Sequence, residues 1–195
     1  MPTVIVPFAG AAGKTRLLAP ERVRRALALA MLGDVLDACV ATGPVLVVTS
    51  DDEAAALAHE LGVETRADPG GGQGAAVAAA LASVGGPVLV VNADLPCVVA
   101  DDLHALLAAA GAGAALVEAP DGTTNALALT LPSAFAPLYG PGSAARFRAL
   151  LDAVSVDLPG LADDVDTLDD LRRLAARCGP RTRSCVAREL QEIPA

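Results

Sequence analysis

The segment TVIVPFAGAAGKTR, residues 3–16, joins an apolar run to a glycine-rich turn that contains Lys14. The run is rich in β-branched residues, which is typical of a buried strand in a parallel sheet. A P-loop of the ATPase type requires a glycine where this chain has Phe8, and counting from Gly10 leaves too few spacer residues to wrap a phosphate in the same way. The segment therefore predicts a strand followed by a ligand-binding turn that is not a P-loop.

The alternation of strand and helix continues along the chain. Apolar runs predict further strands at 44–49, 87–92, 114–119, 125–131 and 154–158. Helical patterns lie between them, at 21–41, 51–61 and 74–84, after Asp101 and Asp102, after Ser143, and from Thr167 to about Arg177. The sequence predicts an α/β fold over residues 1–195, a single domain with a mainly parallel, Rossmann-like sheet and helices on both faces. Sheets of this kind bind ligands at the carboxyl ends of their strands.

The composition fits one soluble globular domain, since 53% of the 195 residues are hydrophobic and 19% are charged. The longest uncharged stretch, 74–93, is broken by Gly85, Gly86 and Pro87, so we expect no transmembrane helix. The chain starts without a secretory signal pattern, and we expect a cytoplasmic protein with no membrane partner. Without any CxxC spacing, the cysteines are expected to be reduced packing residues: Cys39, Cys97, Cys178 and Cys185.

The charge is unevenly distributed. A net charge of −9 argues against a nucleic-acid partner, yet the residues up to 33 carry five basic side chains and one acidic side chain. Lys14 is the only lysine beside thirteen arginines. We expect an anionic ligand of limited size at this end of the chain, with Lys14 as a point charge near it.

Two acidic motifs follow predicted strands. Asp94, in NADLP, comes directly after an apolar run, and DDVDTLDDL (163–171) places Asp164 and Asp166 just before a helix. Either motif has a structural alternative: Asp94 as a turn residue, and Asp166 or Thr167 as a helix N-cap. Together they suit Mg²⁺ on a nucleotide, which uses one or two protein carboxylates. We predict Asp94 and Asp166 as the metal ligands, with Asp164 as the alternative to Asp166.

The order of these motifs resembles a family. The lysine-containing loop, ADLP, GTTNALAL (122–129), LYGPGSAARF (138–147) and DVDT occur in the order of the guanylyltransferases of deazaflavin coenzyme F-420 biosynthesis. The resemblance covers about residues 3–187. It implies a nucleotidyltransferase with a glycosyltransferase-A-like fold, similar to nucleotide-diphospho-sugar transferases, that joins GTP to phosphoenolpyruvate or 2-phospho-L-lactate.

The resemblance also implies roles for individual residues. Lys14, Asp94 and Asp166 would be catalytic, with Mg²⁺ on the two aspartates. Thr124, Gly140 and Ser143 would bind the phosphorylated carboxylic acid. GTP would be bound by Gly10, Ala11, Gly13, Lys14, Arg16, Gln73 and Gly74.

Two positions depart from the family pattern. Gly74 stands where the family usually has an asparagine on the guanine side, and Phe147 stands where it usually has a histidine. The alternatives are a molybdenum-cofactor-type or sugar-nucleotide transferase of the same fold, and a non-enzymatic nucleotide-binding regulator. The heavy use of Ala, Arg and Gly resembles high-GC actinobacterial proteins, whose family members are associated with phosphoenolpyruvate, so we expect that acceptor. The sequence predicts neither an oligomeric state nor a role for the tail from about residue 178.

Overall fold

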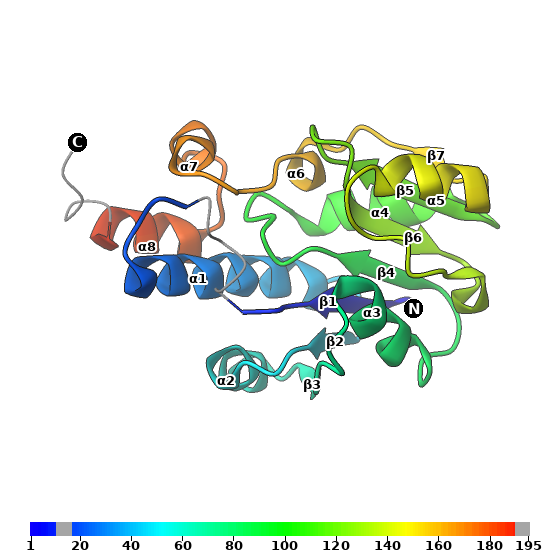
Figure 1. The fold of residues 1–195 in the computed structure, drawn as a ribbon, viewed down its shortest axis with the longest axis horizontal. Coiled ribbons are helices and arrows are strands. Elements are labelled where there is room, and N and C mark those ends of the chain that lie inside the picture. Colours follow the sequence, from blue (N-terminus) through cyan, green and yellow to red (C-terminus); the bar gives the residue numbers. More distant parts are fainter. Residues whose placement is uncertain (11–16, 190–195) are drawn as a thin grey trace.

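A central sheet organises the molecule (Figure 1). In this computed structural model the described residues are 1–10 and 17–189. Within them the sheet has seven strands in the order β3-β2-β1-β4-β6-β5-β7. The strands are β1 (Thr3–Pro7), β2 (Val45–Val48), β3 (Glu64–Arg66), β4 (Val88–Val91), β5 (Ala114–Glu118), β6 (Thr124–Leu129) and β7 (Val154–Ser155).

Helices cover both faces of this sheet, as predicted. The residues of β1 alternate, with Val4 and Val6 in one core cluster and Ile5 in the other. The first cluster packs against α1, α2, α4 and α6, and the second packs against α3 and α5. The helices are α1 (Glu21–Val40), α2 (Asp52–Glu60), α3 (Gln73–Leu81), α4 (Ala100–Ala110), α5 (Ser143–Leu151), α6 (Pro159–Ala162), α7 (Leu168–Leu174) and α8 (Pro180–Glu189), with a 3₁₀ turn η2 (Pro132–Ala134).

The sheet is mainly parallel, which confirms the prediction, but β6 runs the other way. It pairs antiparallel with both β4 and β5, whereas the β1–β2, β1–β4, β2–β3 and β5–β7 pairs are parallel. Val91, the last residue of β4, lies opposite Ala126 near the start of β6. The reversal therefore brings Thr124 and Asn125 to the carboxyl end of β4, where ligands of such sheets bind.

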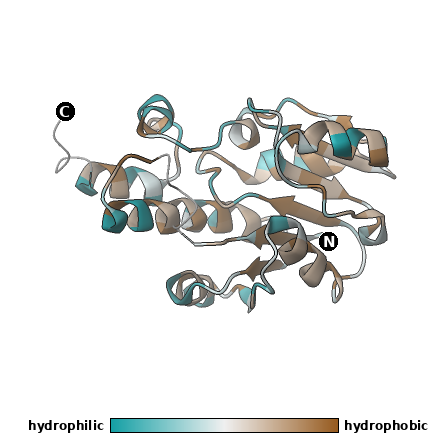
Figure 2. Cartoon of the chain, viewed as in Figure 1, coloured by the Kyte–Doolittle hydropathy of each residue, from teal (hydrophilic) through white to brown (hydrophobic). Residues whose placement is uncertain are grey.

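The hydropathy of each element follows its position. Strands β2 and β4 are brown along their length in Figure 2, whereas the outer helices alternate between brown and teal. Every residue of β2 and β4 is buried, because helices cover both sides of these strands. No helix of the described segments is long and apolar enough to cross a membrane.

The segment after residue 178 belongs to the fold. Residues 180–189 form α8, which lies along α1 (Figure 1). Cys178 and Cys185 join a third core cluster with Leu27 and Met31 of α1. The sequence predicts no role for this segment, because it is rich in arginine and has few apolar residues. All four cysteines are free and buried, as predicted.

Other elements also differ from expectation, among them β3, β7 and α7, and neither α6 nor the turn η2 was predicted. Strand β3 was not predicted, because the short exposed segment Glu64–Arg66 carries no apolar signal and forms only by pairing with β2. The expected strand at 154–158 is reduced to Val154–Ser155. The helix expected from Thr167 to about Arg177 ends at Leu174.

Candidate active site

A cavity of about 290 Å³ opens at the carboxyl ends of β1 and β4. Its apolar wall includes Phe8 after β1, Met31 of α1 and Ala76 of α3. Its polar lining is Asp68, Gln73, Asn92, Asp94 and Asp166. A concave, mostly apolar site with a few polar groups is the usual form of a small-molecule site. The predicted residues Gly10, Gln73, Asp94 and Asp166 all line it.

Three carboxylates meet at one end of the cavity. Asp94, Asp164 and Asp166 are half-buried, and each offers one oxygen within 4.8 Å of the others. The backbone joins their two loops, since the Val165 N–H donates to the Asp94 carbonyl at 3.1 Å. Carboxylates held this close repel one another, and a hard divalent cation with oxygen ligands offsets that repulsion. The structure thus brings together both predicted metal ligands and the alternative residue Asp164.

The start of α7 decides which residue caps that helix. Thr167 is the N-cap, and its hydroxyl accepts from the Asp170 N–H at 3.2 Å. The Asp170 carboxylate accepts in return from the Thr167 N–H at 2.9 Å, which completes the capping box. Asp166 is therefore not the cap, and it lines the cavity instead.

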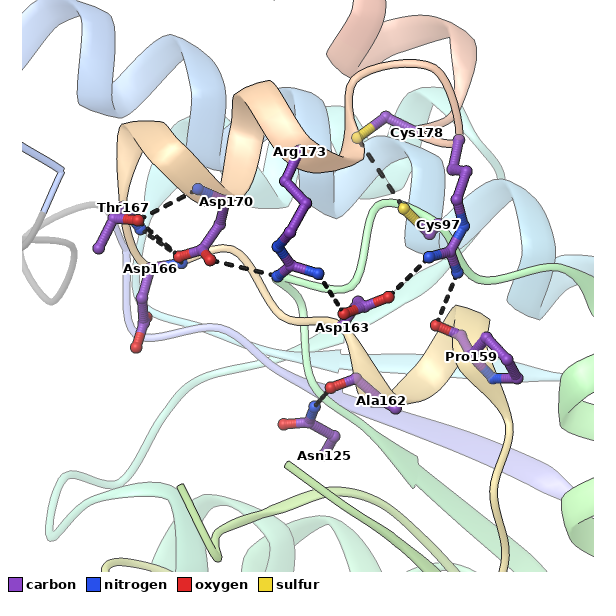
Figure 3. A network of polar contacts seen from close by, with 11 residues as sticks. Cys97, Asn125, Pro159, Ala162, Asp163, Asp166, Thr167, Asp170, Arg173 and Cys178 are labelled. Atoms are coloured by element: carbon purple, nitrogen blue, oxygen red, sulfur yellow. Dashed lines mark hydrogen bonds and ion pairs between the residues drawn. The ribbon is translucent and has the colours of Figure 1, made fainter. Parts of the chain in front are cut away.

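An ion-pair network holds the loop behind the three acids (Figure 3). Asp163 accepts from Arg173 and from Arg177, each at 2.7 Å, and Arg173 also reaches Asp170 at 3.2 Å. Partial burial raises the pKa of Asp163, but the hydrogen bonds and charges of the two arginines outweigh it, so its pKa lies below the ordinary 3.8. Asp170 likewise has a lowered pKa, because bonds from Thr167 and Arg173 outweigh its desolvation. The network fixes the segment between α6 and α7.

Amide side chains form a second network, which begins at the cavity lining with Gln73 and Asn92. Gln73 donates through Nε2 to Asn92 Oδ1 at 2.7 Å. Asn92 donates through Nδ2 to the Thr124 carbonyl at 3.3 Å and to Asn125 Oδ1 at 3.4 Å. Asn125 in turn donates to the Ala162 carbonyl at 3.0 Å (Figure 3). This network ties α3 to β4, β6 and α6.

The three residues predicted for the acceptor lie together. The hydroxyls of Thr124 and Ser143 are 2.9 Å apart, and the Ser143 N–H donates to the Gly140 carbonyl at 3.0 Å. Thr124 and Ser143 are buried and do not belong to the lining of the cavity. Gly140 lines a neighbouring groove, which also contains Gln73 and Gly74.

Gly74 has a packing role in addition. A Cβ at this position would lie 2.7 Å from Pro137 Cβ, so only glycine allows α3 to approach the segment before Tyr139 this closely. The asparagine that the family usually has at this position would not fit here without a shift of the backbone.

The turn that the sequence predicts to bind phosphate extends beyond the described residues. Gly10 has a positive φ of 84°, and a Cβ on it would lie 3.1 Å from Asp51 Oδ2. The predicted ligands Ala11, Gly13, Lys14 and Arg16 lie outside the described residues.

Comparison with known proteins identifies the family. Residues 2–172 match the family model described as guanylyl transferase CofC like. The chain belongs to this CofC-like guanylyl transferase family. It is 38% identical to the phosphoenolpyruvate guanylyltransferase of Streptomyces scabiei, over 96% of this chain and 97% of the relative. The enzyme of the same name from Thermomonospora curvata is 40% identical, over 91% of this chain and 85% of the relative.

A solved structure agrees with the CofC-like assignment at the level of the fold. A nucleotidyl transferase from Methanothermobacter superposes with a TM-score of 0.68 at 18% identity, covering 89% of this chain and 95% of the other. As a CofC-like guanylyl transferase, the chain is an enzyme of the nucleotidyltransferase class, and the predicted resemblance and fold are confirmed. The two alternative functions receive no support.

Some residues of the site were not predicted from the CofC-like motifs. Asp68 and Asn92 line the cavity, and Asn125 lies behind it in the amide network. Asn92 stands two residues before Asp94, at the end of a strand, and this position was a usable signal. Asp68 follows β3, whose short polar sequence gave no signal of a strand.

Proposed function

We propose that this chain transfers GMP from GTP to phosphoenolpyruvate, releasing pyrophosphate and forming a guanosine diphosphate-linked intermediate of coenzyme F-420 biosynthesis. The observation that carries the proposal is the similarity over nearly the whole length to relatives that bear this enzyme's name. The cavity at the carboxyl end of β1 and β4, with its three acids, supports it because this chemistry needs a nucleotide and a bound cation.

The donor set fits Mg²⁺. Carboxylate oxygens are its preferred protein ligands, and Asp94, Asp164 and Asp166 supply three of them within 4.8 Å of one another. When bound, Mg²⁺ would neutralise charge on the nucleotide phosphates and polarise the α-phosphate.

The reaction is an in-line displacement. An oxygen of the acceptor phosphate forms a bond to the α-phosphorus of GTP, and the bond from that phosphorus to the bridging oxygen breaks, so that pyrophosphate leaves. The acceptor phosphate is already ionised, so the protein needs no general base, and its residues act by alignment and by charge. Lys14 would neutralise the α-phosphate, and Thr124, Gly140 and Ser143 would hold the acceptor.

The function is tested by incubating the enzyme with GTP, Mg²⁺ and phosphoenolpyruvate, and following pyrophosphate release and product mass. Asp94→Ala is expected to lower turnover by at least about a hundredfold, because it removes a charge that holds the cation. The control is Asp101→Ala, at an exposed position of α4, which should react like the wild type. Near wild-type turnover of Asp94→Ala, with its fold intact by circular dichroism, would contradict the role of this residue.

The acceptor is tested in parallel with 2-phospho-L-lactate. The two acids share a phosphate and a carboxylate, so the residues proposed to hold the acceptor would contact groups that both acids have. A shape difference of this size is worth about 1–3 kcal/mol in a binding site. We expect a higher kcat/KM with phosphoenolpyruvate. A preference for 2-phospho-L-lactate would change the acceptor, and no reaction with either acid would contradict the guanylyltransferase proposal.

A further inference from the structure

In the amide network, every hydrogen bond runs in one donor-to-acceptor direction, from Gln73 to Asn92 to Asn125. Backbone carbonyl groups fix this direction, because they can only accept hydrogen bonds. The carbonyl of Ala162 can only accept, so the group of Asn125 that faces it at 3.0 Å must be the NH₂. Asn125 Oδ1 is thereby left as the acceptor for Asn92 Nδ2. The Thr124 carbonyl, which can also only accept, fixes the same orientation of Asn92 independently.

The orientation of Asn92 also fixes the orientation of the Gln73 amide. Because the NH₂ of Asn92 faces Thr124 and Asn125, its Oδ1 faces α3 and accepts from Gln73 Nε2 at 2.7 Å. If the Gln73 amide were turned round, its oxygen would face Asn92 Oδ1, and two acceptors would meet without a proton between them. One N–H of Gln73 is committed to Asn92, while its Oε1 and second N–H remain for a ligand.

Amides are rare elsewhere in this chain. Asn92 and Asn125 are its only asparagines, and Gln73 and Gln191 its only glutamines. Asn125 is almost completely buried, so this network places polar groups in the interior directly behind the cavity. Such a network rigidifies the side chain at its end, and here that side chain lines the cavity.

We propose that Gln73, held in one orientation by Asn92 and Asn125, reads the six-position edge of the purine base. The proposal rests on the proposed use of GTP. Guanine presents an acceptor at O6 beside a donor at N1–H, whereas adenine presents a donor at N6 beside an acceptor at N1. An amide that could rotate would pair with either base. An amide of fixed orientation pairs with only one arrangement of donor and acceptor at positions 6 and 1, for a base held in one pose. Asn92 and Asn125 are therefore positioning residues for specificity.

The anionic groups of the substrates are less suitable hydrogen-bond partners for Gln73 than the base. Phosphoenolpyruvate offers a carboxylate and a phosphate, which only accept, and the Gln73 carbonyl oxygen would repel them. A purine edge presents one donor and one acceptor, which match the N–H and the oxygen that Gln73 has left. The apolar wall formed by Phe8 and Ala76 in the same cavity suits a flat base.

The test compares GTP, ITP and ATP as donors, with kcat/KM from pyrophosphate release and Kd from calorimetry. Gln73→Met and Asn92→Leu keep the approximate volume but remove the amide. Each is expected to lower the ratio of kcat/KM for GTP over ATP by about ten- to a hundredfold, because buried hydrogen bonds to the base are lost. ITP keeps O6 and N1–H, so its kcat/KM should fall by the same factor as that of GTP.

Ser83→Ala is the control, since Ser83 follows α3 and bonds to Arg66 at 2.7 Å, away from the cavity. It should leave the ratio unchanged. The proposal is overturned if Gln73→Met lowers kcat/KM for GTP and ATP equally, or if it raises only the KM of the acceptor. If the wild type transfers no nucleotide at all, the proposed function fails, but the Kd ratio for GTP over ATP still tests the reading of the base.

Discussion

At the scale of single residues, the site depends on side chains that follow strand ends. Asp94 follows β4, Gly10 follows β1, and Asn92 lies between β4 and Asp94. The carboxyl ends of these neighbouring strands lie at the same edge of the sheet, so the polar groups converge although they are distant in sequence. Each of these positions has a steric or electrostatic requirement that a substitution can test.

Gly10→Ala is expected to impair nucleotide binding. Its φ of 84° disfavours any residue with a Cβ, at a cost of about 1 kcal/mol, and the new Cβ would meet Asp51 beside the cavity. The matched control is Gly62→Ala, where φ is 70° but nothing lies within 4 Å of the added atom. Both variants should lose similar stability in denaturant titrations, whereas only Gly10→Ala should raise the KM for GTP. An unchanged KM would mean that this turn does not bind the nucleotide.

At the scale of helices, α8 is fastened to α1 at both ends. Asp34, which is buried, accepts from the Arg181 and Thr182 N–H groups at 2.9 and 2.8 Å. At the other end Arg22 pairs with Glu189 at 2.6 Å. A carboxylate from α1 thus satisfies the first turn of α8, where free N–H groups and the helix dipole favour a negative charge.

Asp34→Ala should lower the free energy of unfolding by about 2 kcal/mol, because two N–H groups lose a charged partner in a buried site. The control is Asp37→Ala, one helical turn further along α1, which removes only an ion pair with Arg181 near the surface. We expect at most about 1 kcal/mol from that change. Denaturant titration measures both, and equal losses would contradict the capping role of Asp34.

The loop between α6 and α7 is expected to make stability depend on pH. Asp163 and Asp170 have pKa values below the ordinary 3.8, so their contribution is fully present above that pH and is lost as the pH falls through the lower folded pKa. Asp163→Asn should therefore be less stable than the wild type at pH 7, and the difference should shrink on acidification below about pH 4. Asp169→Asn is the control, since its carboxylate is exposed and, within the part of the chain that the structure describes, forms a surface ion pair with Arg172. A difference that stays constant down to pH 3 would contradict this assignment.

At the scale of the whole molecule, the site concentrates negative charge. Three carboxylates lie together in a chain whose net charge is already −9. A divalent cation bound among them would reduce the repulsion between these charges.

Mg²⁺ is therefore expected to raise the melting temperature of the wild type by several degrees, because binding to the native state alone stabilises it. Asp164→Asn and Asp166→Asn should each reduce this rise, because each removes a carboxylate that could bind the cation. Asp157→Asn, at an exposed position beyond β7, is the control and should respond to Mg²⁺ like the wild type. If only one of the first two variants loses the response, that residue is the ligand beside Asp94. Differential scanning calorimetry with and without a chelator makes the measurement.

The sequence by itself determined most of the elements and their order, the mainly parallel sheet and the family, and it predicted four of the residues that line the cavity. These follow from local signals: β-branched runs for strands buried on both faces, 3.6-residue periodicity for helices, and polar residues directly after strand ends. Asp94 and Asp166 could be named from such signals, whereas Gly10 and Gln73 were implied by the family resemblance, and all four line one cavity. The roles of Lys14 and its loop remain predictions.

Only the tertiary structure decided the rest, because the deciding contacts join residues far apart in the chain. Strand β3 exists through its pairing with β2, and α8 through a carboxylate of α1, so neither has a sufficient signal in its own sequence. The reversed strand β6 brings Asn125 beside Asn92, and the direction of the amide network depends on the carbonyl of Ala162. Local pattern places a polar residue at a strand end, but the partner that fixes its orientation comes from the packing of other elements.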